Sequence, residues 1–377
     1  MSDRTRIEWT DATWNPIVGC SVVSPGCTNC YAMRMAGGRL RNHPSRQGLT
    51  VPSKAGPVWN GEVRLIEGAL DQPLRWARRR RIFVCAHGDL FHENVPDEWI
   101  DRVFAVMALA PRHSFQVLTK RPERMRSYML EQWQGTLAQN VLGEGIAAGR
   151  PTGRREQIAE ACEPFLDQLG LVDETNDSLW AADGSCLAMK WKWHLPNVWL
   201  GVSVEDQLRA DERIPLLLDT PAAVRFVSAE PLLGPVDLTK YMHDSDCAFA
   251  SIGRIEPCTC SEPREVGLDW VIVGGESGPG ARPMHPDWAR SLRDQCAAAR
   301  VPFFFKQHGE WIWAPESMNF AEAAAWAGGR RFEHHSNGGT AVRIGKKVAG
   351  RVLDSRLHDA MPSPARAIAR AREVARR

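Results

Sequence analysis

Short apolar runs, rich in β-branched and aromatic residues, recur along this chain and predict buried strands. Most of them are followed by a cluster of polar residues and then by a helical pattern. The runs lie at 17–19, 82–86, 115–118, 198–202, 224–227 and 270–273, with a seventh at 302–305. Between the second and third runs, Ile100, Val103 and Met107 share one face of a predicted helix at 97–110. Strands that alternate with helices in this way predict a parallel sheet with right-handed crossovers.

Six or seven strand–helix units are enough to form a full or partial (β/α) barrel, which we favour over a flat doubly wound sheet. We therefore expect an α/β barrel core at residues 1–310, with insertions at about 132–196 and 240–266. Residues 311–377 are expected to form a small C-terminal extension that ends in a basic helix.

Polar residues that directly follow the strands form the active face of such barrels. This rule gathers the following residues at one end of the predicted sheet, beside a cysteine-rich loop: Asp89, Lys120, Ser203, Glu205, Glu230, Glu276 and Lys306. Lys120 and Arg121 could bind phosphate or carboxylate groups, or they could be solvated charges at the start of a helix. Glu276 follows Gly274 and Gly275, where glycine would let a ligand approach the backbone, although a plain turn explains the same pattern.

Three cysteines near the start of the chain, Cys20, Cys27 and Cys30, carry the strongest chemical signal. Three thiolates in a loop rich in Gly and Pro can bind three irons of a [4Fe–4S] cluster and leave the fourth iron open to a small molecule. A structural zinc site usually has a fourth Cys or His nearby, and a catalytic one uses three ligands and water. Because no His lies between Cys20 and Cys30, the pattern favours an iron–sulfur cluster.

The composition narrows the class of protein. The chain has 377 residues, 44% of them hydrophobic and 24% charged, which is typical of a soluble globular protein. Its net charge of +2 shows no overall bias toward polyanions, so a nucleic-acid surface would have to be a local patch. We find neither an apolar run of membrane-spanning length nor a signal-like N-terminus, and we expect a cytoplasmic protein without a membrane partner. Its ten cysteines are then expected to bind metal or to be buried rather than to form disulfides.

The remaining cysteines have both a chemical and a structural interpretation. Cys85, inside the predicted second strand, could donate a hydrogen atom to a substrate radical, but packing of a buried free cysteine explains it better. Cys258 and Cys260, with Cys247 and His243, could bind zinc or a second cluster. Their spacing is unhelpful, so an unliganded loop is the favoured interpretation.

Histidines and basic patches are open to two interpretations as well. His87 and His92 could be acid–base groups or metal ligands, or simply polar residues of a loop over the barrel. The basic patches are Arg78, Arg79, Arg80 and Arg81, and the C-terminal Arg366, Arg370, Arg372, Arg376 and Arg377. Such patches suit a phosphate backbone, although runs of charge are usually solvated faces. A cluster at 191–194 with two Trp residues could stack on bases, but packing of an insertion explains it better.

Five further motifs accompany the cysteine loop. They are DLFH at 89–92, LTKRP at 118–122, GVSVE at 201–205, SAEPLLG at 228–234 and VGGESG at 273–278. In this combination the chain resembles a phage-associated three-cysteine family, widespread in phages and bacteria and generally labelled as of unknown function. The resemblance covers roughly residues 7–311 and 345–354. More distantly, the chain is similar to the radical S-adenosylmethionine (radical SAM) superfamily, which has a partial barrel and a three-cysteine cluster loop.

The distant resemblance implies a radical-SAM type of barrel and a role for each matched residue. Cys20, Cys27 and Cys30 would bind the cluster. The implied cofactor contacts are Asp89 with the methionine amino group, Ser203 and Glu205 with ribose hydroxyls, and Glu230, Gly275 and Glu276 with cofactor or substrate. The loop departs from the commonest superfamily pattern, because six residues separate Cys20 from Cys27 and the aromatic Tyr31 follows Cys30 instead of preceding it.

Together, these expectations predict a radical enzyme. In it, one electron from a reduced cluster would cleave S-adenosylmethionine and give a 5′-deoxyadenosyl radical. Asp89, Lys120 and Glu230 are the expected catalytic residues, an electron-donor protein is an expected partner, and a nucleic acid or nucleotide is the expected substrate. One alternative is a non-catalytic nucleic-acid-binding phage protein whose cysteine loop is stapled by a metal. Another is a metal-dependent hydrolase with ligands such as His87, Asp89 and Glu230.

Overall fold

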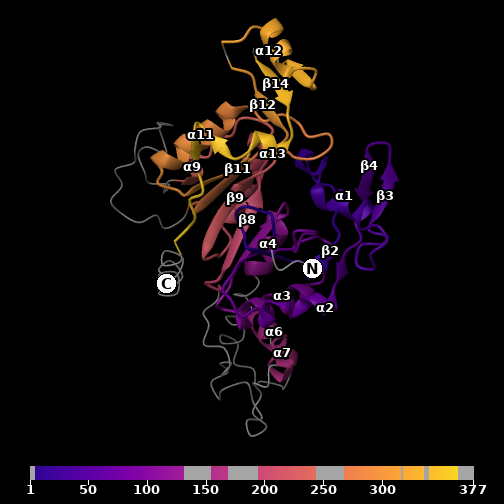
Figure 1. The fold of residues 1–377 in the computed structure, drawn as a ribbon. Coiled ribbons are helices and arrows are strands. Elements are labelled where there is room, and N and C mark those ends of the chain that lie inside the picture. The colour runs from indigo at the N-terminus through magenta and orange to yellow at the C-terminus, as the bar shows by residue number, and fades with distance from the viewer. Residues whose placement is uncertain are drawn as a thin grey trace.

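A parallel sheet of seven strands is the centre of the structure. The computed structural model describes residues 5–130, 154–168, 194–242, 267–315, 317–334 and 339–363. In order across the sheet, the strands are β1 (Ala12–Trp14), β6 (Arg81–Val84), β7 (Ser114–Thr119), β8 (Val198–Ser203), β9 (Val224–Ala229), β10 (Trp270–Gly274) and β11 (Phe303–Gln307). Every neighbouring pair is parallel. The sheet curls into a half-barrel (Figure 1), which confirms the expected α/β class and partial barrel.

Helices connect these strands. The long crossovers are α3 (Asp97–Leu109) between β6 and β7, α8 (Gln207–Leu218) between β8 and β9, and α11 (Pro286–Ala298) between β10 and β11. The shorter helices are α2 (Glu67–Leu70), η2 (Gln72–Arg75), α4 (Pro122–Leu130), α6 (Arg154–Glu160), α7 (Glu163–Gln168) and α9 (Thr239–Met242). Helix α8 starts where it does because Asp206 caps it, with its carboxylate accepting a hydrogen bond of 2.9 Å from the backbone N–H of Arg209. None of the helices in the described ranges is long and apolar enough to cross a membrane.

The two faces of the sheet have different cores, because side chains alternate between faces along a strand. Val227 and Val271 pack with the crossover helices in the larger core. The concave face is filled by a second cluster, made of Trp9, Trp199, Val224, Phe226, Trp270, Ile272 and Phe304. Trp270 lies at its centre, with ring centroids of four other aromatic residues at 5.7–6.2 Å. Most members of this cluster lie in the first half of their strands, so aromatic and aliphatic side chains fill the amino end of the half-barrel.

A wing projects between β1 and β6 in the sequence. It consists of α1 (Tyr31–Gly37) and the hairpin of β3 (Thr50–Ser53) and β4 (Gly56–Trp59), and Figure 1 shows it at one side of the half-barrel. The short strand β2 (Ile17–Val18) pairs with β5 (Arg64–Leu65) below it. The apolar run at 17–19 is therefore not the first strand of the sheet, and that prediction was wrong. Strand β1 takes this place, and three residues before Asn15 and Pro16 are too few to give a recognisable run.

The chain beyond β11 forms a small antiparallel sheet and then returns to the half-barrel. The small sheet contains β12 (Trp311–Trp313), β14 (Thr340–Arg343) and β13 (Phe332–His334), beside α12 (Phe320–Ala327). It is followed by α13 (Lys346–Ala349), β15 (Val352–Leu353) and β16 (Arg356–Leu357). Phe305 N–H then donates to the carbonyl of His358 at 2.8 Å, along the outer edge of β11. The expected basic helix lies outside the described residues, as do most residues of the two expected insertions.

Candidate functional site

The cysteine loop, residues 20–30, starts beside the carboxyl end of β6. Gly19 leads into it and forms a parallel bridge with Gly88, just after that strand. Cys27 ends the short 3-10 helix η1 (Pro25–Cys27), and its N–H donates to the carbonyl of Ser24 at 2.9 Å. Cys30 directly precedes α1 and donates from its N–H to the carbonyl of Cys27 at 3.1 Å. All three thiols of the loop are partly exposed and free of disulfides.

Arg121 is the first of three anchors that fix this loop to the strand ends. Its Nη1 donates to Asp89 Oδ2 at 3.0 Å and lies 3.6 Å from Cys20 Sγ. Its Nη2 donates to Ser21 Oγ at 2.7 Å, and its Nε donates to Glu93 Oε2 at 2.6 Å. Arg121 is 8% exposed, so the guanidinium is a buried link between the ends of β6 and β7 and the first cysteine.

Asp89 holds Arg121 in place through its carboxylate. Its Oδ1 accepts hydrogen bonds from Thr119 Oγ1 at 2.8 Å and from the N–H of Phe91 at 3.0 Å. Its Oδ2 accepts from Arg121 and, at 3.3 Å, from the N–H of Lys120. The carboxylate therefore has four protein donors, and its acceptor capacity is filled by the barrel itself.

Glu205, after β8, is the second anchor. Its Oε1 accepts from the N–H of Gly26 in the cysteine loop at 3.3 Å, and its Oε2 accepts from Arg213 at 3.1 Å. The side chain is fully buried. Burial acts to raise the pKa of Glu205, but the positive charges of Lys120 and Arg213 outweigh burial and hold the pKa below its ordinary value. Glu205 is thus an anionic support for the loop.

Glu276, after β10, is the third anchor. Its Oε2 accepts from Asn29 Nδ2 at 2.9 Å, so it reaches the residue directly before the third cysteine. Its Oε1 accepts from Arg282 Nη2 at 2.7 Å, and the same nitrogen donates to the carbonyl of Pro25 at 3.0 Å. The 6% exposure of Glu276 places this network in the protein interior. Together, the three anchors confirm that the cysteine loop and strand ends meet.

The environment of Cys20 controls its protonation. Burial raises the pKa of the Cys20 thiol to about 12, and the nearby Asp89 charge adds to this increase. Arg121 acts in the opposite direction through its charge and its contact with the sulfur. The free thiol is therefore protonated at neutral pH, and a metal that binds the sulfur must displace its proton.

A separate polar group lies on the concave face at the carboxyl end of the sheet. Ser228 is two residues beyond Phe226 in β9, so it shares the face of the aromatic cluster but lies one step nearer the carboxyl end. Ser228 Oγ donates to Glu230 Oε2 at 3.1 Å. Lys306 Nζ, from β11, lies 3.0 Å from Glu230 Oε1. Glu230 is thus held at the open end of the half-barrel by residues of β9 and β11, the two strands on either side of β10.

Ser203 and Lys120 extend this group toward β8 and β7. Ser203 is buried and lies two residues beyond Gly201, whose missing side chain makes room for the ring of Phe226. Lys120 directly follows β7, and its positive charge acts on Glu205, which follows β8. No carboxylate of the described residues lies within ion-pair distance of Lys120. We refer to Lys120, Ser203, Ser228, Glu230 and Lys306 as the mouth group.

Gly275 and Cys85 both have a structural role. A side chain at Gly275 would collide with the carbonyl of His308, so this glycine lets the ends of β10 and β11 approach one another. Cys85 does not lie inside a strand, because β6 ends at Val84 and Cys85 has a positive φ of 57°. Burial raises the pKa of the Cys85 thiol to about 12, and the side chain belongs to the large core. Packing is therefore its observed role.

The two histidines near Asp89 are neutral side chains in different surroundings. Burial, followed by the charge of Arg46, lowers the pKa of His87 to about 4, and its ring contacts Tyr31 edge-on. His92 is fully buried, and its Nε2 lies 3.0 Å from Ser21 Oγ. Burial is also the main cause of the lowered pKa of His92. Throughout the described ranges, no three or more His, Cys, Asp or Glu residues are grouped so that they could hold a metal ion.

The expected nucleic-acid patch before β6 lies at the end of the sheet opposite the cysteine loop. Arg78 and Arg79 are exposed, but they precede a strand of a parallel sheet, so they lie at the end opposite the cysteine loop. The Arg80 guanidinium covers the ring of Trp76, with its central carbon 4.8 Å from the ring centroid, and Arg81 pairs with Asp11 at 2.7 Å. The C-terminal arginines, Cys247, Cys258, Cys260 and residues 191–193 lie outside the described residues.

Several partners of the anchors were missed by sequence reasoning. They are Ser21, Asn29, Glu93, Arg213 and Arg282. One of them had a recognisable signal, because Arg213 lies on the buried face of α8 with Ala210, Ile214 and Leu217. A charged residue on the apolar face of an amphipathic helix indicates a buried ion pair. The others come from loops, where residue type alone indicates no partner.

The fold and the site define an α/β half-barrel protein with a cysteine loop fixed over the carboxyl ends of its strands. The model of one family matches residues 4–362, and the chain belongs to that family, which is described as "Protein of unknown function (DUF5131)". The comparisons with curated proteins and with solved structures gave no match.

Proposed function

We propose that this protein is a radical enzyme that holds a [4Fe–4S] cluster on Cys20, Cys27 and Cys30 and binds S-adenosylmethionine at the open end of the half-barrel. The observation that carries the proposal is the docking of the cysteine loop. Its three anchors, Arg121, Glu205 and Glu276, follow three different strands, β7, β8 and β10, and Asp89 after β6 holds the first of them. They hold the loop at the end of the half-barrel where the mouth group lies, and binding sites occur at this end of parallel barrels.

The donor set of the loop suits a cluster better than a single metal ion. In a cluster each thiolate binds a different iron, so three sulfurs need not converge on one point. A structural zinc ion usually has four protein ligands, whereas the loop supplies three cysteines and has no histidine between Cys20 and Cys30. Arg121 can donate a charge-assisted hydrogen bond to Cys20 Sγ, which favours the thiolate form that a metal ligand requires.

The mouth group offers positions for the rest of a cofactor and for a substrate. When bound, the cluster would supply the electron that cleaves S-adenosylmethionine. Lys120, a half-buried cation with no carboxylate in ion-pair distance among the described residues, suits a carboxylate. The buried Ser203 suits a ribose hydroxyl, and Glu230, held by Lys306, can bind a donor group of a substrate. Asp89, Glu205 and Glu276 support the loop in this proposal.

The cluster proposal is tested by anaerobic purification of the full-length protein. We expect a brown protein with broad visible absorption, and iron and acid-labile sulfide in amounts near four per chain. With a reductant and S-adenosylmethionine, it should form 5′-deoxyadenosine. Cys27→Ala should lose both the iron and this product, while Cys296→Ala, which removes a buried thiol of α11, should retain both.

A colourless protein with stoichiometric zinc would contradict the proposal and favour a metal-stapled, non-catalytic loop. A brown protein that forms no 5′-deoxyadenosine would support the cluster and exclude the radical step.

The substrate class that we propose is nucleic acid or nucleotide.

A further inference from the structure

The segment around the cysteine loop has an unusual charge distribution. Residues 12–61 contain five Lys and Arg residues and no Asp or Glu, although the whole chain has 45 acidic residues and a net charge of +2. All five cations, Arg34, Arg39, Arg41, Arg46 and Lys54, belong to the wing or to the turns within it. The wing is therefore a local cationic element at the end of the half-barrel that carries the cysteine loop.

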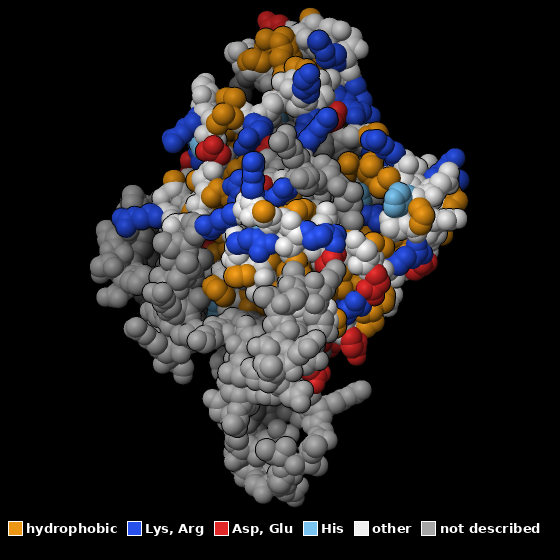
Figure 2. Space-filling model, turned by 60° about the horizontal axis from the view of Figure 1, so that its bottom comes forward, with side chains coloured by type: hydrophobic (Ala, Val, Ile, Leu, Met, Phe, Trp, Pro, Cys, Tyr) orange, Lys and Arg blue, Asp and Glu red, His pale blue; other side chains and the backbone are white. Residues whose placement is uncertain are grey.

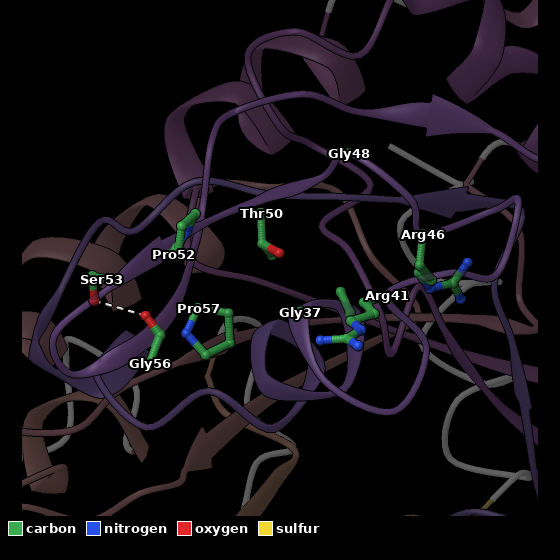
Figure 3. A pocket seen from close by; sticks show the side chains of 10 residues that line it. Gly37, Arg41, Arg46, Gly48, Thr50, Pro52, Ser53, Gly56 and Pro57 are labelled. Atoms are coloured by element: carbon green, nitrogen blue, oxygen red, sulfur yellow. Dashed lines mark hydrogen bonds between the residues drawn. The ribbon is translucent and has the colours of Figure 1, made fainter.

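Surface charge alone does not select one binding area, because Figure 2 shows Lys and Arg side chains spread over the middle of one face. A pocket in the wing is more specific. It has a volume of about 410 Å³ and lies between α1 and the β3–β4 hairpin. Figure 3 shows Arg41 and Arg46 toward one side of it, the Ser53–Gly56 turn at the other, and Thr50 between them.

Arg46 is a buried cation without a compensating anion. It is 6% exposed, and its Nη1 donates only to Ser45, to the carbonyl at 3.2 Å and to the hydroxyl at 2.8 Å. Its Nε is buried and has no hydrogen-bond partner among the described residues. No carboxylate in the described ranges forms an ion pair with it, in contrast to the buried Arg121 and Arg213.

This arrangement costs stability unless a ligand compensates for it. A buried charge needs an opposite charge and hydrogen bonds to offset its desolvation. Burial is the main cause of the lowered pKa of Arg46, and the positive charge of nearby Arg64 lowers this pKa further. Both effects disfavour the charged form of Arg46. A bound anion with several acceptor oxygens would supply the missing partner, and a guanidinium donates to such groups through two nitrogens at once.

We propose that the pocket between α1 and the β3–β4 hairpin binds a phosphate group of a nucleic-acid backbone, with Arg46 and Arg41 as its cationic contacts. The position of Tyr31 favours a nucleic acid over a free anion. Tyr31 follows Cys30 at the start of α1 and is 67% exposed, while Ala36 and Gly37 at the end of α1 line the pocket. Seven helical residues span about 10 Å, which is within the reach of one or two nucleotides.

Binding of a fluorescent single-stranded oligonucleotide, followed by anisotropy, tests the assignment. Arg46→Gln and Arg41→Gln should each weaken binding about tenfold for any sequence. Each should also lower the slope of log affinity against log salt by about one, because one phosphate contact is lost. Arg39→Gln is the matched control, since it removes an exposed cation of the wing that does not line the pocket. The control should keep the slope of the wild type.

Thermal unfolding keeps the test independent of folding defects. Without ligand, Arg46→Gln should be at least as stable as the wild type, because it removes an uncompensated buried charge. The oligonucleotide should raise the melting temperature of the wild type more than that of Arg46→Gln. Equal oligonucleotide affinities of Arg46→Gln and Arg39→Gln would overturn the proposal. The proposal would also be overturned if inorganic phosphate raised the melting temperature of the wild type and the oligonucleotide did not. Neither assay requires the cluster or a reductant. Failure of the phosphate-site proposal would therefore leave the cluster proposal untouched.

Discussion

The guanidinium of Arg121 connects Cys20 to Asp89. One nitrogen, Nη1, lies 3.6 Å from the sulfur of Cys20 and 3.0 Å from Oδ2 of Asp89. Asp89 follows β6 and Arg121 follows β7, so the side chain that joins two strand ends also positions the first cysteine. The stability of the half-barrel and the geometry of the cysteine loop are therefore coupled through one residue.

Replacement of Arg121 by glutamine should destabilise the fold and loosen the loop together. The change leaves Asp89 buried without its cation, and breaking a buried ion pair costs about 3 kcal/mol. Urea unfolding measures the loss, and iron content after desalting measures the loop. Arg331→Gln, which removes a surface ion pair with Glu333, should change both by little. Unchanged iron retention in a destabilised Arg121→Gln would show that the two properties are separate.

The stability of the protein should depend on Glu205 in acid. Its folded-state pKa lies below the ordinary glutamate value of 4.5, so the unfolded chain takes up the proton first as the pH falls. The stabilisation is complete above pH 4.5 and is lost as the pH falls through the lower folded-state pKa. As the pH falls below about 5, the urea midpoint of the wild type should fall more steeply than that of Glu205→Gln. Parallel curves would contradict this assignment.

Glu230→Gln should separate cluster binding from activity. Glu230 belongs to the mouth group and is not an anchor of the loop, so the variant should keep its iron. Loss of a charged group that contacts a substrate lowers turnover by about a hundredfold or more. Iron analysis and formation of 5′-deoxyadenosine by the same preparation measure the two effects, with Glu333→Gln in the small sheet as a control. Wild-type turnover in Glu230→Gln would remove this residue from the site.

Gly201→Ala should destabilise the concave core. A Cβ at this position would lie 2.6 Å from ring atoms of Phe226, which is itself fully buried. Overpacking of this kind costs about 1–3 kcal/mol. The urea midpoint should therefore fall in Gly201→Ala and recover in part when Phe226→Leu is added, because the smaller side chain makes room. Additive losses in the double variant would argue against direct contact.

Apolar runs predicted six strands of the sheet, because buried parallel strands are continuously hydrophobic. Val198–Ser203 and Val224–Ala229 are buried at every position, and their runs were unmistakable in the sequence. Strand β1 was missed, since three residues give no pattern to detect. The run at 17–19 is just as apolar, but its pairing with β5 depends on a contact with distant residues.

The site was predictable in its location but not in the roles of its residues. Asp89, Glu205 and Glu276 lie within five residues after the end of a strand, which places them correctly at the carboxyl end of the sheet. In the structure these residues contact the cysteine loop or arginines, and their expected contact with a cofactor stays a prediction. Alternation along a strand fixes which face Ser228 occupies, but the rule no longer applies once the strand has ended. Sequence order therefore could not distinguish anchors from the mouth group.

The distance along the chain between the loop and its anchors imposes an order on biosynthesis. Gly26 must meet Glu205, and Asn29 must meet Glu276, which emerges from the ribosome about 250 residues later. At ordinary translation speeds, Glu276 is made some tens of seconds after Asn29. The cysteines are thus exposed on a nascent chain well before the residues that hold their loop have been made.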